Sequence, residues 1–317
     1  MILCSLRGTN LTKVSNIGAP SESNTKTFFV SIVTSACRRP VNLIRVVDLR
    51  LRVKRHQSEL EYPVNFSVCV PPMFGKLDNV FDLVEFIEVN RVLGAQKFQL
   101  YVQSVGPRVA SCMRVYARRG IVDIQPWILP SDIAGGTYYH GQVMAINECL
   151  YRMMYLSKYV ISQDLDELIV PKSSDNWSSM VNNINKDTRK DVRRIASYSF
   201  RNRFFPTTWP YSTAGRFKTL IVMHADKRLY PFNRRSKVMA RPERVLIWHV
   251  HLIFDSSLVR RGDANIGVNA KHGELFHYKR GVRVARKTTV YRMNNFKLAI
   301  LRGLQHDPAA ICFTSRM

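Results

Sequence analysis

Two kinds of apolar segment alternate along residues 64–162, and this alternation limits the possible folds more than any other feature of the chain. Short apolar or alternating runs predict β-strands at residues 64–70, 97–102, 121–124 and 159–162. Apolar side chains at helical spacing predict helices at residues 78–89, 108–118 and 138–156. Strands that alternate with helices favour an α/β fold, with a mostly parallel sheet and helices on both faces.

Turn residues mark the ends of two of these elements. Pro71 and Pro72 are expected to end the first strand, because proline cannot donate to a strand ladder. Gly94 is expected to end the first helix, where a glycine can adopt the left-handed conformation.

An acid cluster follows the last predicted strand. Asp164, Asp166 and Glu167 lie within four positions, and Asp164-Leu165-Asp166 is the one Asp-x-Asp sequence in the chain. Ligands of open α/β sheets bind beyond the carboxyl ends of the strands. Mg²⁺ and Mn²⁺ accept one or two carboxylates and leave their other positions to water and substrate phosphates. The cluster therefore predicts a metal site for nucleotide-diphosphate chemistry; a capped structural turn is the alternative.

A strongly basic composition raises a second class of function. The formal net charge is +25, which by itself suggests nucleic acid or an anionic membrane surface as a partner. Residues 61–180 nevertheless hold 10 Lys and Arg against 12 Asp and Glu, so the excess flanks the segment with the acid cluster. No helix-turn-helix, zinc-finger or RNA-recognition pattern is found, and no nucleic-acid partner is expected. A solvated basic surface and a site for a polyanionic small molecule are the two interpretations left open.

Cysteines, sequons and hydropathy bear on the compartment. The six cysteines have no Cys-x-x-Cys spacing, which argues against a zinc ribbon, while their even number permits disulfides. Sequons at Asn10, Asn65 and Asn176 permit a secretory location. No stretch approaches the ~18–20 apolar residues that span a bilayer. As given, the chain is expected to be soluble, or to be a fragment of a longer, anchored protein.

Several segments, in order, resemble glycosyltransferase family 92 over about residues 64–280. They are residues 67–75, 85–88, 93–95, 98–101, 139–152, 158–171, 241–245 and 277–279, with His251 between the last two. The resemblance implies an A-type glycosyltransferase fold and an inverting transfer of galactose from UDP-galactose, with manganese, to a glycan acceptor such as fucose on an N-glycan core. It also implies a Golgi location and a membrane anchor, which this chain does not show.

The resemblance and the acid cluster together assign metal and donor residues. Asp166 is expected to bind Mn²⁺ (or Mg²⁺) directly, and Asp164 to contact the donor ribose or the metal through water. Glu167 is expected to stabilise the loop. His251 is similar in position to a late histidine that completes the metal site in A-type transferases, and a satisfied core histidine is the alternative. His249 is expected to share its face, as alternate residues of a strand do.

Other candidates are assigned more loosely. Gln142 and Asn147 are expected either to bind donor hydroxyls or to cap and pack the helix that they open. The general base that an inverting transfer needs is sought among Asp226, Glu243 and Asp255. The basic run over residues 234–241 is expected either to contact the diphosphate or to form a solvated loop. Cys69 and Cys149 are expected to form disulfides in an oxidising lumen, with partners left open.

The resulting division of the chain has three parts. Residues 1–62 are expected to form a basic, loosely ordered extension, residues 63–290 the catalytic domain, and residues 291–317 a C-terminal tail. A degenerate family member that binds nucleotide or glycan without turnover is the main alternative, and a nucleic-acid-binding basic protein is a remote one.

Overall fold

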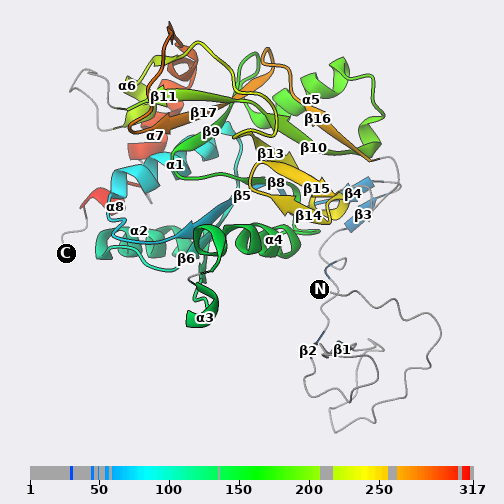
Figure 1. The fold of residues 1–317 in the computed structure, drawn as a ribbon, viewed down its shortest axis with the longest axis vertical. Helices are drawn as coiled ribbons and strands as arrows, with labels where there is room; N and C mark the ends of the chain where they lie inside the picture. The colour runs from blue at the N-terminus through cyan, green and yellow to red at the C-terminus, as the bar shows by residue number, and fades with distance from the viewer. Residues whose placement is uncertain are drawn as a thin grey trace, which may run out of the picture. The chain divides into compact units, whose positions relative to one another are not determined.

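The computed structural model describes residues 29–30, 44–45, 49, 54–56, 59–134, 136–207, 217–255, 263–305 and 309–314. The chain divides into two compact units, residues 1–48 and residues 49–317. In the first unit, β1 (Phe29–Val30) pairs antiparallel with β2 (Ile44–Arg45). Most of the expected N-terminal extension, residues 1–62, lies outside the described residues. The second unit carries the α/β fold (Figure 1).

A seven-stranded sheet forms the centre of the second unit, in the order β16-β10-β13-β8-β5-β6-β7. Its strands are β5 (Val64–Met73), β6 (Lys97–Val102), β7 (Val122–Pro126), β8 (Ser157–Ser162), β10 (Ile195–Phe200), β13 (Lys237–Ala240) and β16 (Ala264–Gly267). The four strands predicted from alternation, β5 to β8, are parallel neighbours, and only the pairings of β13 are antiparallel. Strand order reverses between β5 and β8, and ligands bind at such a reversal.

Helices cover both faces of this sheet, as expected. The helices α1 (Val80–Leu93) and α2 (Pro107–Arg118) pack with Phe66, Val68 and Val70 of β5 in one buried core. The helix α4 (Gln142–Arg152) packs with Cys69 in a second core on the other face. Because neighbouring residues of a strand point to opposite faces, both cores share β5. The predicted α/β class with a mostly parallel sheet is confirmed.

A three-stranded sheet, β11-β17-β9, lies beyond the acid cluster. Its strands are β11 (Asn202–Pro206), β17 (Gly273–Lys279) and β9 (Glu167–Pro171). The acid cluster is therefore the connection between β8 of the central sheet and β9 of this second sheet. The remaining elements are β3 (Lys54–His56), β4 (Glu59–Glu61), α3 (Ser131–Ala134), α5 (Trp177–Asp187), α6 (Lys218–Ile221), β12 (His224–Asp226), β14 (Ile247–His249), β15 (Leu252–Asp255), β18 (Lys287–Thr289), α7 (Lys297–Gln305), α8 (Ala309–Thr314) and 3₁₀ turns at Tyr138–Gly141, Val192–Arg194, Pro242–Arg244 and Arg292–Phe296.

Two predicted boundaries are wrong, for local reasons. The first strand continues through Pro71 and Pro72 to Met73, with an irregular register against β6 between Val70 and Met73. An irregularity of this kind lets a strand pass residues that have no N–H to donate. The helix predicted for residues 138–156 begins at Gln142 and ends at Arg152.

The late start of α4 has a backbone cause. Tyr139, His140 and Gly141 have φ values of 48°, 56° and 73°. These left-handed conformations cannot continue a right-handed helix. The chain therefore holds Tyr139 and His140 in a costly conformation directly before the helix, and Tyr139 also lines the pocket described below.

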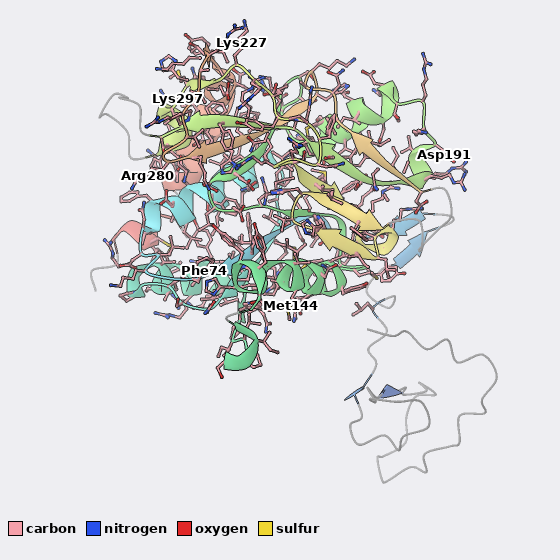
Figure 2. All side chains as sticks on the ribbon, in the orientation of Figure 1. Phe74, Met144, Asp191, Lys227, Arg280 and Lys297 are labelled. Carbon is pink, nitrogen blue, oxygen red and sulfur yellow. A yellow bond between two sulfur atoms is a disulfide. The ribbon has the colours of Figure 1, made fainter. Side chains whose placement is uncertain are left out.

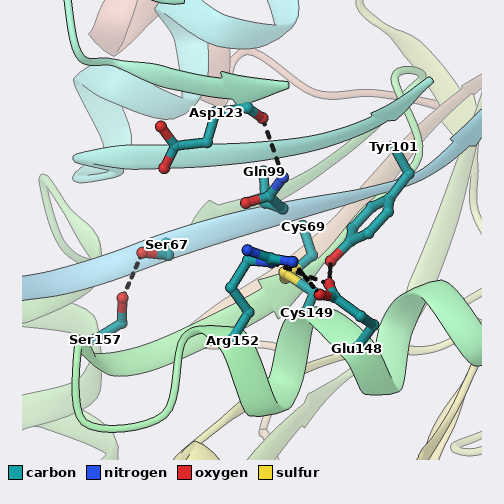
Figure 3. The surroundings of a disulfide bond; sticks show 9 residues. All are labelled: Ser67, Cys69, Gln99, Tyr101, Asp123, Glu148, Cys149, Arg152 and Ser157. Carbon is teal, nitrogen blue, oxygen red and sulfur yellow. Dashed lines mark hydrogen bonds and ion pairs between the residues drawn. A yellow bond between two sulfur atoms is a disulfide. The ribbon is translucent and has the colours of Figure 1, made fainter. Parts of the chain in front are cut away.

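Disulfides tie helices to the sheet and to one another. Cys69 of β5 bonds to Cys149 of α4, so the two cysteines singled out in the sequence are each other's partners (Figure 3). Next to this bond, the Tyr101 hydroxyl donates to Glu148. The second disulfide joins Cys112 of α2 to Cys312 of α8.

The expected divisions of the chain near residues 62 and 290 stay predictions. Within the described residues, no helix has both the length and the apolar content to cross a membrane.

A buried carboxylate links α1 to α6. Glu85 is 2% exposed, and its Oε1 accepts hydrogen bonds of 2.6 Å from both the backbone N–H and the hydroxyl of Thr219. Burial raises the pKa of Glu85 to about 6, although the charge of Lys218 and the Thr219 bonds oppose the rise. The folded protein therefore holds the proton of Glu85 more tightly than the unfolded chain does.

Replacing this carboxylate is expected to stabilise the protein near neutral pH. A raised carboxyl pKa contributes stability that is complete below the unfolded value of about 4.5 and lost as pH rises through about 6. Glu85→Gln keeps an oxygen for both Thr219 donors and should raise the free energy of unfolding by about 1–2 kcal/mol at pH 8. Urea unfolding from pH 4.5 to 8 measures this. Exposed Glu61→Gln is the control, and a gain that does not depend on pH would contradict the account.

Candidate functional site

A pocket of about 530 Å³ lies at the carboxyl ends of β5 and β8. One wall consists of residues 70–73 of β5 and of Phe74, which follows the strand, and another wall is the acid cluster. Side chains from loops and from the second sheet complete it. The polar and charged lining residues are Gln142, Asp164, Asp166, Glu167, Arg235, His251, His277 and Lys279. The structure thus brings Asp164, Asp166, His251 and Gln142 together at the strand-order reversal.

A buried lysine holds the acid cluster in place. Lys237, from β13, is fully buried, and its Nζ lies 3.0 Å from Asp164 Oδ2 and 3.1 Å from Glu167 Oε2. Burial alone would lower the pKa of Lys237, but the two carboxylates more than offset it and raise the pKa, so the ammonium stays charged. One cation of the basic run at residues 234–241 is therefore buried and in contact with two carboxylates of the acid cluster.

Glu167 stabilises the turn between the two sheets. It is 2% exposed, and its Oε2 accepts a hydrogen bond from the backbone N–H of Asp164 at 3.2 Å. Burial raises the pKa of Glu167, while the charge of Lys237 opposes the rise. These contacts hold the loop, and they agree with the role expected for Glu167.

His277 orients Asp166 from the second sheet. Its Nε2 lies 3.3 Å from Asp166 Oδ2, and its Nδ1 lies 3.3 Å from Glu167 Oε1 and 3.0 Å from the amide nitrogen of Asn202. Burial alone would raise the pKa of Asp166, but the hydrogen bond and charge of His277, with Lys279, lower it below its ordinary value. Asp166 is therefore a carboxylate at neutral pH, held by a histidine and available to a cation.

His251 lines the opposite side of the pocket as a neutral imidazole. Its Nδ1 lies 3.1 Å from the carbonyl oxygen of Ser236. Because a carbonyl can only accept, Nδ1 carries the proton and Nε2 keeps a lone pair. Burial and the charge of Lys237 lower the pKa of His251, so the ring is uncharged at neutral pH. A neutral imidazole with a fixed tautomer is the form that binds metals.

His249 does not share the face of His251. The strand β14 ends at His249, and the chain turns through Val250 and His251 before β15 begins. The alternation expected along a strand therefore stops before His251. His249 is exposed and does not line the pocket, whereas His251 does.

Three other candidates, Asn147, Asp226 and Glu243, do not line the pocket. Asn147 donates from its amide to the carbonyls of Val143 and Trp248 and accepts from the Trp248 N–H, so it fastens β14 to α4. Asp226 is buried in β12 and accepts from the backbone N–H of Arg228. Asp255 ends β15, and its side chain lies outside the described residues.

Glu243 lies beside Tyr62, at the amino end of β5 and away from the carboxyl ends that form the pocket. Burial raises the pKa of its carboxyl, against the hydrogen bond from Tyr62 and the charge of Arg241. Because burial accounts for the raised pKa and Glu243 lies away from the pocket, we interpret its bond with Tyr62 as a structural contact.

Residues 277–279 are one of the segments that carry the family resemblance, but the sequence predicts no role for His277 or Lys279. The role of His277 follows from register, because it is the direct cross-strand partner of Glu167 in the pairing of β17 with β9. A separation of 110 positions in the chain hides this contact from any local pattern. The aromatic residues Phe74, Tyr138 and Tyr139 at the rim were missed for the same reason; the Phe74 ring lies 5.7 Å from that of Tyr139.

The donor set is suited to a hard or borderline divalent cation, because carboxylates and a neutral imidazole are ligands of Mn²⁺ and Mg²⁺. Within the described residues, no three His, Cys, Asp or Glu side chains are gathered closely enough to hold an ion. A bound cation would thus take few ligands from the protein, with Asp166 as the direct one and with Asp164 and His251 as the further candidates, and diphosphate oxygens and water would fill the other positions.

The fold and pocket define an α/β protein with an acidic ligand site at the strand-order reversal. The profile of Glycosyltransferase family 92 matches residues 64–308, more than half of the chain, and the chain belongs to this family. The resemblance seen in the sequence is therefore confirmed.

Relatives and solved structures were compared as well. The chain is 25% identical over 240 residues to beta-1,4-galactosyltransferase galt-1 of Caenorhabditis elegans, covering 74% of this chain and 53% of that protein. It is 22% identical over 163 residues to galactan beta-1,4-galactosyltransferase GALS2 of Arabidopsis thaliana, covering 49% and 31%. Among solved structures, S. aureus TarS in complex with UDP-GlcNAc matches with a TM-score of 0.36 and 11% identity, covering 78% of this chain and 69% of that one. The chain spans about half the length of galt-1.

The buried lysine gives the first test of the site. Lys237→Met leaves Asp164 and buried Glu167 without their cation, and removing one partner of a buried ion pair costs about 3–5 kcal/mol. We expect that loss in the free energy of urea unfolding at pH 7.5. Adding Glu167→Gln should recover part of it, because one uncompensated charge is gone. Exposed Lys158→Met is the control; equal stabilities of the Lys237 and Lys158 variants would show that the buried ion pair does not hold the turn.

Proposed function

We propose that this protein is a metal-dependent, inverting glycosyltransferase that moves galactose from UDP-galactose to a glycan acceptor, such as fucose on an N-glycan core. The observation that carries the proposal is the pocket in which Asp164, Asp166 and neutral His251 face one cavity at the strand-order reversal. The names of galt-1 and GALS2, both galactosyltransferases, support galactose as the sugar.

Charges in the pocket suit a metal-bound diphosphate. Carboxylates on one wall attract a divalent cation, while Arg235 and Lys279 line the same cavity and can pair with phosphate oxygens. When bound, Mn²⁺ would neutralise the charge that develops on the departing UDP. Gln142, whose Nε2 lies 3.5 Å from Asp164 Oδ1, orients that carboxylate for the donor.

A secretory location is part of the proposal. Two disulfides, Cys69–Cys149 and Cys112–Cys312, suit an oxidising lumen. Sugar acceptors on N-glycans are found in the same compartment. We place the protein in the Golgi lumen, associated with the membrane.

A non-catalytic family member that binds nucleotide or glycan is the second candidate. Its supporting observation is that no three metal-ligating side chains are gathered in the described part of the chain. Such a protein would bind UDP-galactose normally, yet show neither transfer to an acceptor nor slow hydrolysis of the donor. An enzyme would release UDP from UDP-galactose on prolonged incubation with Mn²⁺.

Donor binding is the decisive first experiment. Isothermal titration with UDP and UDP-galactose, with and without Mn²⁺, should show binding that depends on the metal. Asp166→Ala should weaken it at least about tenfold, because a metal ligand is lost. Exposed Asp191→Ala, labelled in Figure 2, removes a carboxylate outside the pocket and should change nothing. Metal-independent binding, or binding that survives Asp166→Ala, would refute the role of the acid cluster.

A further inference from the structure

A second cavity, of about 400 Å³, has a lining rich in positive charge. It shares no residue with the pocket that contains the acid cluster, hereafter the acid pocket. Lys172 follows β9, Arg203 lies in β11, Lys227 follows β12 and Arg292 lies in the turn after β18. Hydroxyls of Thr288, Thr289 and Tyr291 complete the polar lining, and no acid lines the cavity. Figure 2 labels Lys227 at the outer edge of this part of the molecule.

This cavity lies on the opposite face of the second sheet from the acid pocket. Glu274 and His277 are three positions apart in β17, so their side chains point to opposite faces. His277 faces the acid cluster, whereas Glu274 binds Arg203 through two hydrogen bonds of 2.6 and 3.0 Å. In β11 the same alternation separates Asn202, which contacts His277, from Arg203. The two cavities are therefore separate sites.

Of the four cations of the second cavity, only Arg203 forms an ion pair with a carboxylate among the described residues. Arg203 is neutralised by Glu274, which is 3% exposed. Arg292 donates from Nε and Nη2 to the carbonyls of Pro171 and Ser174, which fixes the guanidinium without cancelling its charge. Exposed Asp175 acts on Arg292 from outside the lining.

Lys172 is the central unpaired cation. Its Nζ lies 5.6 Å from the centre of the Phe276 ring, and among the described residues it has neither an ion pair nor a side-chain hydrogen bond. Burial, followed by the charges of Arg203 and Arg292, lowers its pKa, and Glu274 opposes this only in part. Like charges held together in a half-buried cavity repel one another, and an anion bound among them would relieve that repulsion.

We propose that this cavity binds a doubly charged tetrahedral oxyanion, phosphate or sulfate, either free or as a monoester on a sugar. Arg292 presents its Nη1 group as a fixed donor, since arginine pairs well with phosphate geometry. Lys172 and Lys227 supply point charges, and the hydroxyls of Thr288 and Tyr291 donate to the remaining oxygens, while the Thr289 hydroxyl lies 3.4 Å from His224 Nδ1. Three cations without an ion pair among the described residues favour a dianion over a single carboxylate, and the volume of about 400 Å³ accommodates one sugar phosphate.

Anion titrations test this site. In EDTA, without divalent metal, inorganic phosphate should raise the midpoint of thermal unfolding above chloride at equal ionic strength, and the rise should grow with the logarithm of the phosphate concentration once that exceeds the Kd. Lys172→Met and, separately, exposed Lys227→Met should each weaken phosphate binding at least about fivefold to tenfold, since each removes a charged donor. Lys158→Met is the matched control and should leave phosphate affinity unchanged, as should Asp166→Ala in the other pocket.

The source of the anion follows from two further ligands. Glucose 6-phosphate that binds more tightly than inorganic phosphate would identify a sugar monoester, whereas weaker binding would identify the free ion; sulfate tests whether the site distinguishes the two oxyanions. Equal effects of phosphate and chloride would overturn the proposal. So would phosphate binding that is lost in Asp166→Ala but kept in both Lys172→Met and Lys227→Met.

Discussion

The buried ammonium of Lys237 is the contact on which the functional site depends. Its Nζ lies within 3.1 Å of both Asp164 and Glu167, and so holds together two carboxylates that would otherwise repel each other. A buried charge of this kind is tolerated only when its partners are in place. Since Lys237 comes from β13, which pairs with β8, the ion pair forms only when the central sheet is assembled. The loop that carries Asp166 is thus ordered by the fold itself.

The same loop joins two sheets, and this explains why the pocket has groups of both charges. Strand β5 provides one wall, and the connection from β8 to β9 provides the acids. The second sheet adds His277 and Lys279 from β17, and loops add Arg235 and His251. Carboxylates and cations thereby line one cavity. That combination suits a ligand with alternating charge, which a nucleoside diphosphate and its metal ion provide.

The basic composition divides into several physical roles. Lys237 is internal, Arg235 and Lys279 line the acid pocket, and Lys172 with its neighbours lines the cavity on the other face of the second sheet. Counting charges along the chain showed only that the excess flanks the acid cluster. The net charge of +25 therefore describes no single surface, because each cation acts over a distance limited by screening.

The sequence by itself determined the four parallel strands, their helices, the site at the end of β8 and the family, since strand and helix periodicity and a compact motif are local properties. Two boundaries predicted from the sequence were wrong. The first strand continues past Pro71 and Pro72 through an irregular register, and α4 begins only after residues 139–141, whose backbone is left-handed. Tertiary structure alone decided that Cys69 pairs with Cys149, that Lys237 lies beneath the acids and that His277 meets Asp166. It also separated His251 from His249. Those contacts join residues tens to more than a hundred positions apart, and their partners are selected by sheet register and burial, which no local pattern encodes.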